Sequence, residues 1–146
     1  MSGVAVERVC AAHLFEVAEL ERLCFAEPWS EQALELLLSE DAVGYVCLRD
    51  GCVLAYGGML IAPFEGQITN VAVHPEARRQ GLGKRVVEAL IRDAEERGLE
   101  QIALEVRASN AAAIALYEGL GFAVAGRRKG FYRKPAEDAL VMVKAL

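Results

Sequence analysis

Apolar and polar positions alternate along the 146-residue chain in patterns that predict both strands and helices. Runs with every second residue apolar are typical of half-buried strands, whereas apolar residues three or four positions apart are typical of amphipathic helices. The strand pattern occurs in Val4–Val9, Val43–Leu48, Cys52–Ile61, Gln67–Val73, Gln101–Val106, Phe122–Gly126 and Ala139–Val143. The helix pattern occurs in residues 14–21, Glu31–Leu38, Gly81–Arg97 and a short stretch from Asn110 through Leu120.

Short polar and glycine signals mark where these elements begin and end. Ser30 and Asn110 are good helix N-caps, and Gly98 is a typical stop for the long helix. Asp50-Gly51 separates two predicted strands and is the preferred pair for a two-residue hairpin turn. The element order β-α-α-β-β-β-α-β-α-β-β therefore predicts an α/β domain with a mixed sheet and helices on its faces.

The first predicted helix has one clearly apolar side. Its apolar residues are Leu14, Val17, Ala18 and Leu20. We expect this side to pack on the sheet, and we expect Glu16, Glu19 and Glu21 to face solvent, because charged side chains are rarely buried without a partner.

Composition restricts the class of protein further. Hydrophobic residues make up 54% of the chain, which is too high for a disordered protein. No apolar run reaches the roughly 18 residues that a membrane span needs. The first 25 residues carry several charged side chains, so we expect no secretory signal. We therefore expect one soluble domain spanning residues 1–146 and located in the cytoplasm.

Cysteine and histidine spacing gives no sign of a disulfide framework or a metal site. The residues concerned are Cys10, Cys24, Cys47, Cys52, His13 and His74. The cysteines form no Cys-x-x-Cys pair, and the histidines lie far apart. We interpret the cysteines as reduced and mostly buried small hydrophobes. A catalytic cysteine with a histidine partner stays open.

The net charge of −5 is unevenly distributed along the chain. Residues 1–73 carry 11 acidic and 3 basic side chains, and residues 74–146 carry 10 acidic and 13 basic, so the halves have charges of −8 and +3. A nucleic-acid-binding domain is usually clearly basic, which disfavours that role. The distribution suits a protein that handles an anionic small molecule with its second half and a cationic partner with its first.

The stretch from Arg78 to Lys84 lies between a predicted strand and the long helix. Its glycines allow backbone N–H groups to approach a ligand, and the helix start adds partial positive charge. Full positive charge comes from Arg78, Arg79, Lys84 and Arg85. These features indicate a pyrophosphate cradle. Val86 excludes a dinucleotide-binding fingerprint, and Arg85 after Lys84 excludes a P-loop. The alternative to a ligand site is a helix start made flexible by its glycines, with arginines that are simply exposed to solvent.

Glu105 and Tyr117 are the other candidate functional residues. The apolar residues 102, 104 and 106 share one face of their predicted strand, which puts Glu105 on the other face. A carboxylate within a short apolar strand is costly unless it is paired or used chemically. Glu105 is therefore either a salt-bridged rim residue or a functional one. Tyr117 is either a core tyrosine with a satisfied hydroxyl or a functional one.

These stretches resemble those of a known family. Val71-Ala72-Val73-His74-Pro75 followed by Arg78-Arg79-Gln80-Gly81-Leu82-Gly83 resembles the acetyl-CoA-binding motif of the GNAT superfamily of N-acetyltransferases. Leu104-Glu105-Val106-Arg107-Ala108-Ser109-Asn110 and Ala115-Leu116-Tyr117 resemble the bacterial ribosomal-protein alanine N-acetyltransferases, the RimI family. Further matches are Phe25-x-x-Pro28-Trp29-Ser30 and Glu137-Asp138-Ala139, so the resemblance covers nearly the whole chain.

The resemblance implies a GNAT-like α/β (α+β) fold, with a mixed, mostly antiparallel central sheet of about seven strands flanked by about four helices. It implies acetyl-CoA as co-substrate, without a metal, and a pantetheine arm that runs as an extra strand between splayed neighbours. The residues that would hold acetyl-CoA are Val71, Ala72, Val73, Arg78, Arg79, Gln80, Gly81, Leu82, Gly83, Lys84 and Asn110. Glu105 would be the general base and Tyr117 the general acid.

By the same resemblance, the acetyl group would pass to the N-terminal α-amine of a protein by direct attack in a ternary complex. The acceptor would be the N-terminal alanine of a small-subunit ribosomal protein, with no nucleic acid or membrane involved. Specificity would reside in Cys24–Ser39 and in the loop 127–135. Two alternatives stay open: a lysine, broad N-terminal or small-amine acetyltransferase of the same fold, and a non-catalytic acetyl-CoA-binding module. The presence of both Glu105 and Tyr117 favours an enzyme.

Overall fold

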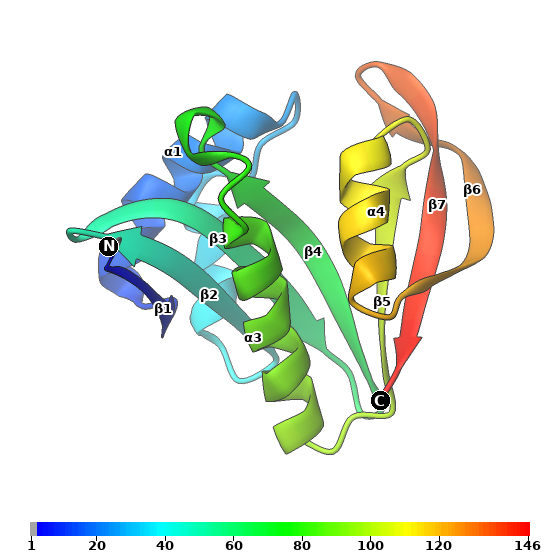
Figure 1. The fold of residues 1–146 in the computed structure, drawn as a ribbon, viewed down its shortest axis with the longest axis horizontal. Coiled ribbons are helices and arrows are strands. Elements are labelled where there is room, and N and C mark those ends of the chain that lie inside the picture. Colours follow the sequence, from blue (N-terminus) through cyan, green and yellow to red (C-terminus); the bar gives the residue numbers. More distant parts are fainter. Residues whose placement is uncertain (1–2) are drawn as a thin grey trace.

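The computed structural model describes residues 3–146, in which seven strands form one sheet with helices on both faces (Figure 1). The strand order across the sheet is β1-β2-β3-β4-β5-β7-β6. The strands are β1 Val4–Arg8, β2 Ala42–Arg49, β3 Cys52–Ile61, β4 Glu65–Val73, β5 Gln101–Arg107, β6 Ala123–Arg133 and β7 Ala136–Ala145. The α-helices are α1 Leu14–Cys24, α2 Glu31–Leu34, α3 Leu82–Glu96 and α4 Ala111–Gly119, with short 3-10 helices at Ala11–His13, Glu35–Leu38 and Pro75–Ala77.

Neighbouring strands run antiparallel everywhere except at the centre of the sheet. There, Glu65–Ile68 of β4 pairs in parallel with Gln101–Leu104 of β5. Helix α3 lies in the connection between them, as a parallel crossover requires. The prediction of a mixed, mostly antiparallel sheet of about seven strands with four α-helices is confirmed.

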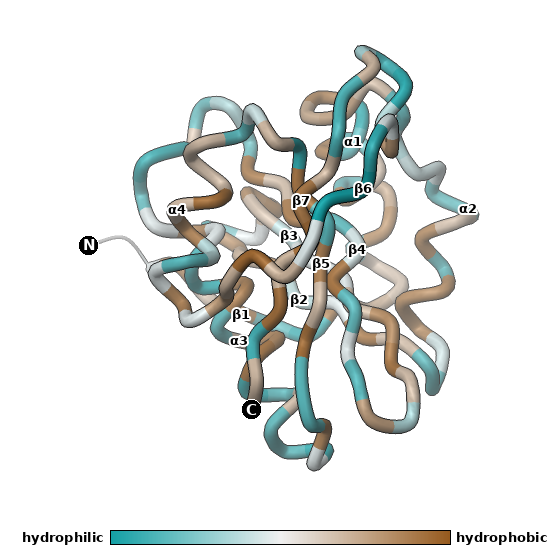
Figure 2. Tube along the Cα trace, turned by 90° about the vertical axis from the view of Figure 1, so that its right-hand side faces the viewer, coloured by the Kyte–Doolittle hydropathy of each residue, from teal (hydrophilic) through white to brown (hydrophobic). Residues whose placement is uncertain are grey.

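Two apolar clusters hold the helices against the sheet. The first joins α3 to β5 and includes Leu82, Val86, Leu90, Ala94, Ile102 and Leu104. In the second, α1 contributes Val17 and Leu20 to a cluster with Tyr56 of β3. Each fully buried aliphatic side chain stabilises the fold by about 1.5–3 kcal/mol. In Figure 2 brown segments recur along the interior strands, whereas much of the edge strand β6 is teal.

The predicted caps and turns are confirmed. Ser30 Oγ accepts a hydrogen bond from Ala33 N–H at 3.0 Å, and Asn110 Oδ1 accepts one from Ala113 N–H at 3.1 Å. Asp50 and Gly51 both have positive φ, 52° and 79°, as the tight hairpin turn requires.

The boundaries of several elements differ from the prediction, most of all in β6, β7 and the helix after Ser30. β6 was expected to end at Gly126 but continues to Arg133, because an edge strand exposed along its length needs no apolar alternation. The helix expected over Glu31–Leu38 changes after Leu34 into a 3-10 helix. Its buried residues, Leu34 and Leu37, lie three positions apart, which matches the tighter helix.

The expectation that Glu21 faces solvent is wrong. Its side chain is fully buried on the inner face of α1. The Tyr56 hydroxyl, the Asn70 side-chain amide at 2.8 Å and the Trp29 backbone N–H at 2.9 Å all donate hydrogen bonds to its carboxylate. These donors replace the water that a buried carboxylate loses, so burial is tolerated.

The prediction that the cysteines are mostly buried is wrong. All four cysteines are free. Cys47 is buried and Cys24 is partly buried, but Cys10 and Cys52 are exposed. The exposed pair lies in the loop after β1 and at the first residue of β3, where apolar sequence neighbours do not imply burial. No helix within residues 3–146 has the length and apolar character to cross a bilayer.

Candidate active site

The sheet opens where β4 and β5 separate (Figure 1). Their ladder ends at the pair Ile68–Leu104, although β4 continues to Val73 and β5 to Arg107. Beyond this pair, β4 keeps its partner β3 on one side and, within residues 3–146, has no strand partner on the other. The splay that the family resemblance requires is therefore present at the predicted strand.

A bulge in β4 coincides with this separation. Three residues of β3, Gly57–Met59, lie opposite four residues of β4, Ile68–Val71. The extra residue bends the strand and changes which side chains share a face. Gln67 and Asn70 are three positions apart and would normally face opposite sides of the sheet. The bulge puts both of them on the face covered by α1.

The free edge of β4 presents backbone groups to the opening. His74 N–H donates to Leu54 O of β3 at 2.8 Å, and alternation along an antiparallel ladder then directs Val71 and Val73 away from β3. Val73 O accepts from Cys24 Sγ at 3.4 Å, which agrees with this direction. An extended ligand lying in the opening would therefore meet peptide groups of both valines.

The loop before α3 is shaped to bind an anion. Arg79 and Gly81 have left-handed backbones, with φ of 65° and 75°. Left-handed residues in such loops aim successive N–H groups into one concavity, and a non-glycine residue pays about 1–2 kcal/mol for that conformation. The N-cap Gly81 supplies no side-chain cap. The first-turn N–H groups of residues 82–84 therefore lack intrahelical partners and sit at the positive end of the helix dipole.

Three exposed basic residues surround this loop: Arg78, Arg79 and Lys84. Arg78 Nε donates to Val73 O at 3.3 Å, which ties the loop to the end of β4. The predicted cradle therefore combines free backbone donors with full positive charge.

Gln80 and Leu82 hold the loop before α3 in place through contacts with the rest of the protein. Gln80 Oε1 accepts from Arg49 Nη2 at 3.0 Å, which links the loop to β2. Leu82 is buried in the core beneath α3, so its backbone alone faces the loop.

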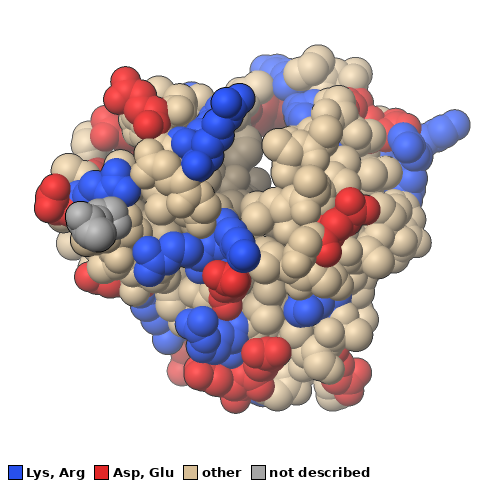
Figure 3. All heavy atoms as spheres, in the orientation of Figure 1, with Lys and Arg blue, Asp and Glu red and all other residues tan. Residues whose placement is uncertain are grey.

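Gly83 lies at the mouth of the opening between β4 and α4. A Cβ at this position would meet Val73 Cγ2 at 3.4 Å and Leu116 Cδ2 at 3.6 Å, which are ordinary contacts. A side chain longer than alanine would therefore extend into the opening. In Figure 3 the surface is hollowed between the part formed by α3 and β4 and the part formed by α4.

Glu105 lies at the point of separation on the face opposite α3, as its alternation with buried Leu104 and Val106 predicts. Gln67 Nε2 lies 3.2 Å from Glu105 Oε1, and Arg128 Nε of β6 lies 3.3 Å from Oε2. The carboxylate is thus paired, and its side chain is 14% exposed. The structure is compatible with both alternatives for Glu105, because the Arg128 side chain is itself 59% exposed and displaceable.

Tyr117 reaches the core from α4, on the other face of the sheet. Its ring packs edge-on against Phe122, with centroids 5.6 Å apart. Burial raises the pKa of the Tyr117 hydroxyl above its usual range, and the nearby Tyr132 hydroxyl adds to this shift. Within residues 3–146 no protein acceptor binds the hydroxyl proton, which leaves both alternatives for Tyr117 open.

Asn110 begins α4 and caps its first turn through Oδ1. The residue is exposed, and capping leaves its side-chain NH₂ free to donate. Asn110 therefore serves the fold and can also contact a ligand.

A groove of about 510 Å³ lies between the turn after α1 and the β6–β7 hairpin. Its aromatic lining consists of Phe25, Trp29, Phe131 and Tyr132, and its charged lining consists of Glu27, Arg107 and Lys134. The two segments predicted to carry specificity therefore meet here. The expected division of charge is only partly right, since Glu27 faces two basic residues of the second half.

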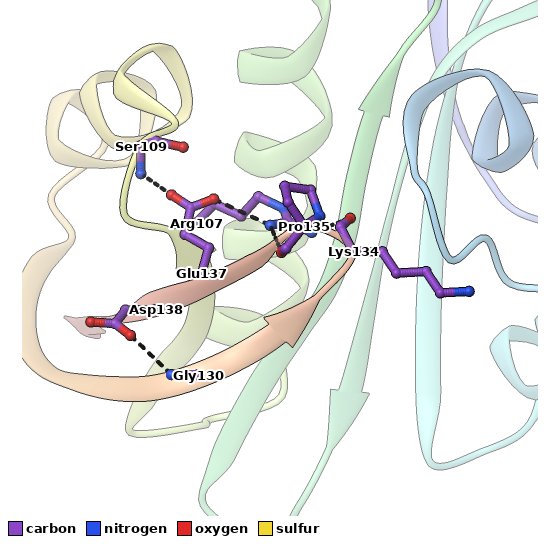
Figure 4. Close-up of polar contacts among 7 residues, drawn as sticks. All are labelled: Arg107, Ser109, Gly130, Lys134, Pro135, Glu137 and Asp138. Atoms are coloured by element: carbon purple, nitrogen blue, oxygen red, sulfur yellow. Dashed lines mark hydrogen bonds and ion pairs between the residues drawn. The ribbon is translucent and has the colours of Figure 1, made fainter.

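A polar network fixes the hairpin wall of this groove (Figure 4). Arg107 Nη1 donates to Pro135 O at 2.9 Å and Nη2 to Lys134 O at 3.0 Å. The guanidinium also pairs with Glu137 Oε1 at 3.2 Å and lies 4.3 Å from the centre of the Tyr132 ring. Because Arg107 and Glu105 share a face of β5, the groove lies on the same side of the sheet as Glu105.

Glu137 and Asp138 hold the start of β7. Ser109 N–H donates to Glu137 Oε2 at 2.6 Å, which links the hairpin to the residue before the α4 cap. Gly130 N–H donates to Asp138 Oδ1 at 2.9 Å and stabilises the irregular part of β6. These bonds, with Arg107 and Arg127 nearby, keep the pKa of both carboxyl groups below their usual values.

The predicted residues therefore gather around one opening, with the cradle and Tyr117 on the α3–α4 side and Glu105 on the α1 side. Gln67, Asn70 and Glu21 were missed by sequence reasoning, because the bulge that brings two of them onto one face has no recognisable signal. Within the described part of the chain, no three His, Cys, Asp or Glu side chains gather closely enough to hold a metal ion.

Comparisons with known proteins agree with this geometry. Residues 14–122 match the acetyltransferase (GNAT) family. The ribosomal protein bS18-alanine N-acetyltransferase of Escherichia coli (strain K12) is 40% identical over 125 residues, 84% of each chain. The N-alpha-acetyltransferase RimI of Mycobacterium tuberculosis is 33% identical over 146 residues, 95% of this chain and 90% of the relative.

A solved structure is similar in fold as well as sequence. The crystal structure of the ribosomal-protein-S18-alanine N-acetyltransferase from Escherichia coli matches with a TM-score of 0.90 and 35% identity, covering 97% of this chain and 93% of that one. On these grounds the chain belongs to the GNAT family of acetyltransferases.

Proposed function

We propose that this chain is a single N-acetyltransferase domain that transfers the acetyl group of acetyl-CoA to the N-terminal α-amine of a protein. One observation carries the proposal: the sheet is open at its centre, with Glu105 at the opening on one face and Tyr117 on the other. A thioester lying in the opening is then accessible to an amine from the groove side and to a proton donor from the helix side.

The cradle supports the assignment of acetyl-CoA as co-substrate. A pyrophosphate carries negative charge that suits the free first-turn N–H groups of α3 and the side chains of Arg78, Arg79 and Lys84. The pantetheine amides would pair with Val71 and Val73, completing the ladder that β5 leaves open. Asn110 would add a side-chain contact through its free NH₂.

Base catalysis is assigned to Glu105. A protein α-amine has a pKa of about 7.7–8.0, so a large part of it is already neutral near pH 7.5, whereas a lysine amine near about 10.4 would be almost fully charged. A carboxylate can take the remaining proton directly or through water as the nitrogen attacks the thioester carbonyl. The acceptor ammonium would displace Arg128 from Glu105 as it enters.

Acid catalysis is assigned to Tyr117. When the new C–N bond forms and the C–S bond breaks, the sulfur leaves as a thiolate and takes one proton. A hydroxyl whose pKa is raised by burial keeps its proton until that moment. The attack is direct, so no enzyme nucleophile and no metal are needed.

The acceptor is proposed to be a ribosomal protein with an N-terminal alanine, on the strength of the relatives at 40% and 35% identity. Such an acceptor is available in the cytoplasm, and no nucleic acid or membrane is needed. A lysine, broad N-terminal or small-amine acceptor is the second candidate, because the groove carries both Glu27 and Lys134 and does not select one charge.

The test is to incubate the protein with acetyl-CoA and a peptide library that varies the first three residues and includes internal lysines. Mass spectrometry then maps the modified amines. Acetylation confined to N-terminal alanine supports the proposal, and acetylation confined to lysine overturns it. Cofactor binding without any product would identify a binding module.

A further inference from the structure

Glu21 is a fully buried carboxylate that the reaction proposed above does not use. Its three hydrogen-bond donors come from three different elements: Tyr56 on β3, Asn70 on β4 and the Trp29 backbone after α1. Burial, followed by the Glu21 carboxylate, raises the pKa of the Tyr56 hydroxyl, so Tyr56 remains a donor. Among residues 3–146, no basic side chain forms a salt bridge with Glu21.

Two of these donors belong to residues that line the groove, Trp29 and Asn70. Asn70 uses its side-chain NH₂ to bind Glu21 at 2.8 Å. An amide with its nitrogen fixed has its oxygen fixed as well. Within the described chain no donor occupies Asn70 Oδ1, so this oxygen is available to a ligand in the groove. Glu21 therefore determines which atom of Asn70 is available there.

We propose that Glu21 is a positioning residue for the acceptor amine, which it serves by holding Asn70 Oδ1 toward the groove and by fixing the Trp29 turn. An N-terminal ammonium brings three N–H donors and needs acceptors wherever it leaves water. Asn70 Oδ1 supplies one of them. The buried negative charge behind Asn70 adds attraction, which is stronger away from water. This inference rests on the proposed function, in which the groove receives a protein N-terminus.

A second buried carboxylate in the same protein provides the contrast. Asp93 on α3 is 8% exposed and accepts from the Tyr45 hydroxyl at 2.7 Å. It also forms a salt bridge with Arg97, one turn further along α3. Asp93 thus joins helix to sheet with its charge neutralised. Glu21 has a similar tyrosine partner but no cation, and its other partners face a ligand groove.

The donors around Glu21 make Glu21→Gln a test of the proposal. In Glu21→Gln, one carboxylate oxygen becomes an NH₂ that points at the Asn70 NH₂, and two donors cannot pair. The Asn70 amide is then expected to rotate, binding Gln through its oxygen and presenting NH₂ to the incoming ammonium. Adding Asn70→Asp removes the conflict, since a carboxylate can accept from Gln on one oxygen and from the ammonium on the other.

The experiment compares wild type, Glu21→Gln and Glu21→Gln/Asn70→Asp with an Ala-initiated peptide. Peptide affinity is followed by the fluorescence of Trp29, the chain's single tryptophan, and KM and kcat are measured for both substrates. Losing a hydrogen bond to a charged group should weaken peptide binding roughly tenfold to a hundredfold in the single variant. The double variant should regain most of this loss, and the KM for acetyl-CoA should not change.

Two controls separate positioning from stability. Asp93→Asn and Tyr56→Phe should both lower the melting temperature without changing peptide affinity, because neither rotates Asn70. If Glu21→Gln binds the peptide as wild type does, or if Asn70→Asp fails to restore binding, the proposal is wrong. A wild-type protein that binds the peptide without acetylating it would overturn the proposed function, and the affinity series would still decide the role of Glu21.

Discussion

Gln67 of β4 binds Glu105 of β5 across the end of the ladder between the two strands, whose last pair is Ile68–Leu104, with Gln67 Nε2 3.2 Å from Glu105 Oε1. The candidate base is therefore held at the edge of the opening by a side chain of β4, the strand from which β5 diverges at this point. Arg128 approaches the other carboxylate oxygen from β6. Glu105 thus has one neutral partner, Gln67, and one charged and exposed partner, Arg128. In the proposed mechanism, Gln67 would keep the carboxylate in position while a substrate amine replaces Arg128.

Replacing Glu105 with Gln should reduce kcat/KM more at pH 6.5 than at pH 9. The reason is that the α-amine, with a pKa of about 7.7–8.0, needs a base at low pH and is already neutral at high pH. Steady-state kinetics across this range tests the role, with Glu118→Gln on the exposed side of α4 as the control. A loss of equal size at every pH would indicate that Glu105 positions the substrate and does not take its proton.

Tyr117→Phe should lower kcat by roughly 10²–10⁴-fold, the usual contribution of a positioned acid, while acetyl-CoA affinity stays the same. The raised pKa of Tyr117 has a further consequence: the hydroxyl stays protonated at alkaline pH, so wild-type activity should not fall there through loss of this acid. Tyr45→Phe, which alters the α3–β2 contact instead, is the matched control. Wild-type turnover by the Phe variant would remove Tyr117 from the mechanism.

Substitutions at Gly83 should distinguish space from charge in the cradle. Gly83→Ala adds a Cβ that makes only ordinary contacts, so acetyl-CoA binding should weaken little. Gly83→Asp adds a negative charge beside the pyrophosphate and should weaken binding by more than a factor of ten, while the helix keeps its stability because acidic residues suit a helix N-terminus. Calorimetry measures the affinities. Equal affinities for the two variants would show that no phosphate lies here.

The β6–β7 hairpin should lose order in acid before the rest of the sheet. The pKa values of Glu137 and Asp138 are lower in the folded protein than their ordinary values of 4.5 and 3.8. Their contribution to stability is therefore complete above about pH 5 and is lost as the pH falls through the lowered values. The protection of the Ser109 and Gly130 amides against hydrogen exchange, relative to the intrinsic rate at each pH, should fall below about pH 4, and Glu137→Gln should abolish the change at Ser109. Uniform exchange across the sheet would contradict this.

The sequence predicts the elements well because local chemistry determines them. The N-caps Ser30 and Asn110, the Asp50-Gly51 turn and the i+4 row of α3 each act within a few residues, and all four occur as expected. The roles proposed for Glu105 and Tyr117 come from the family resemblance and stay predictions. Strand alternation located the face of Glu105 and left its role open.

Features that depend on distant partners were not predictable in the same way. The local sequence predicts that Glu21 faces outward from its helix. Its burial becomes favourable only because Tyr56 and Asn70, 35 and 49 positions away, donate hydrogen bonds to its carboxylate. The length of β6 depends on pairing with β7, because its own sequence is basic and exposed. Burial of Cys10 and Cys52 failed as a prediction for the related reason that position in the fold, not composition, decides exposure.

The single extra residue in β4 means that the number of residues in this strand, as well as their identity, determines which side chains reach the site. Deleting Asn70 would remove the bulge and restore strict alternation, but it would leave Glu21 and the groove without the Asn70 amide. The edited chain would still contain Glu105, Tyr117 and the whole glycine-rich loop. A family member with every recognisable motif intact would then lack the Asn70 acceptor in the groove through a one-residue gap, and only an alignment that respects the length of this strand would reveal it.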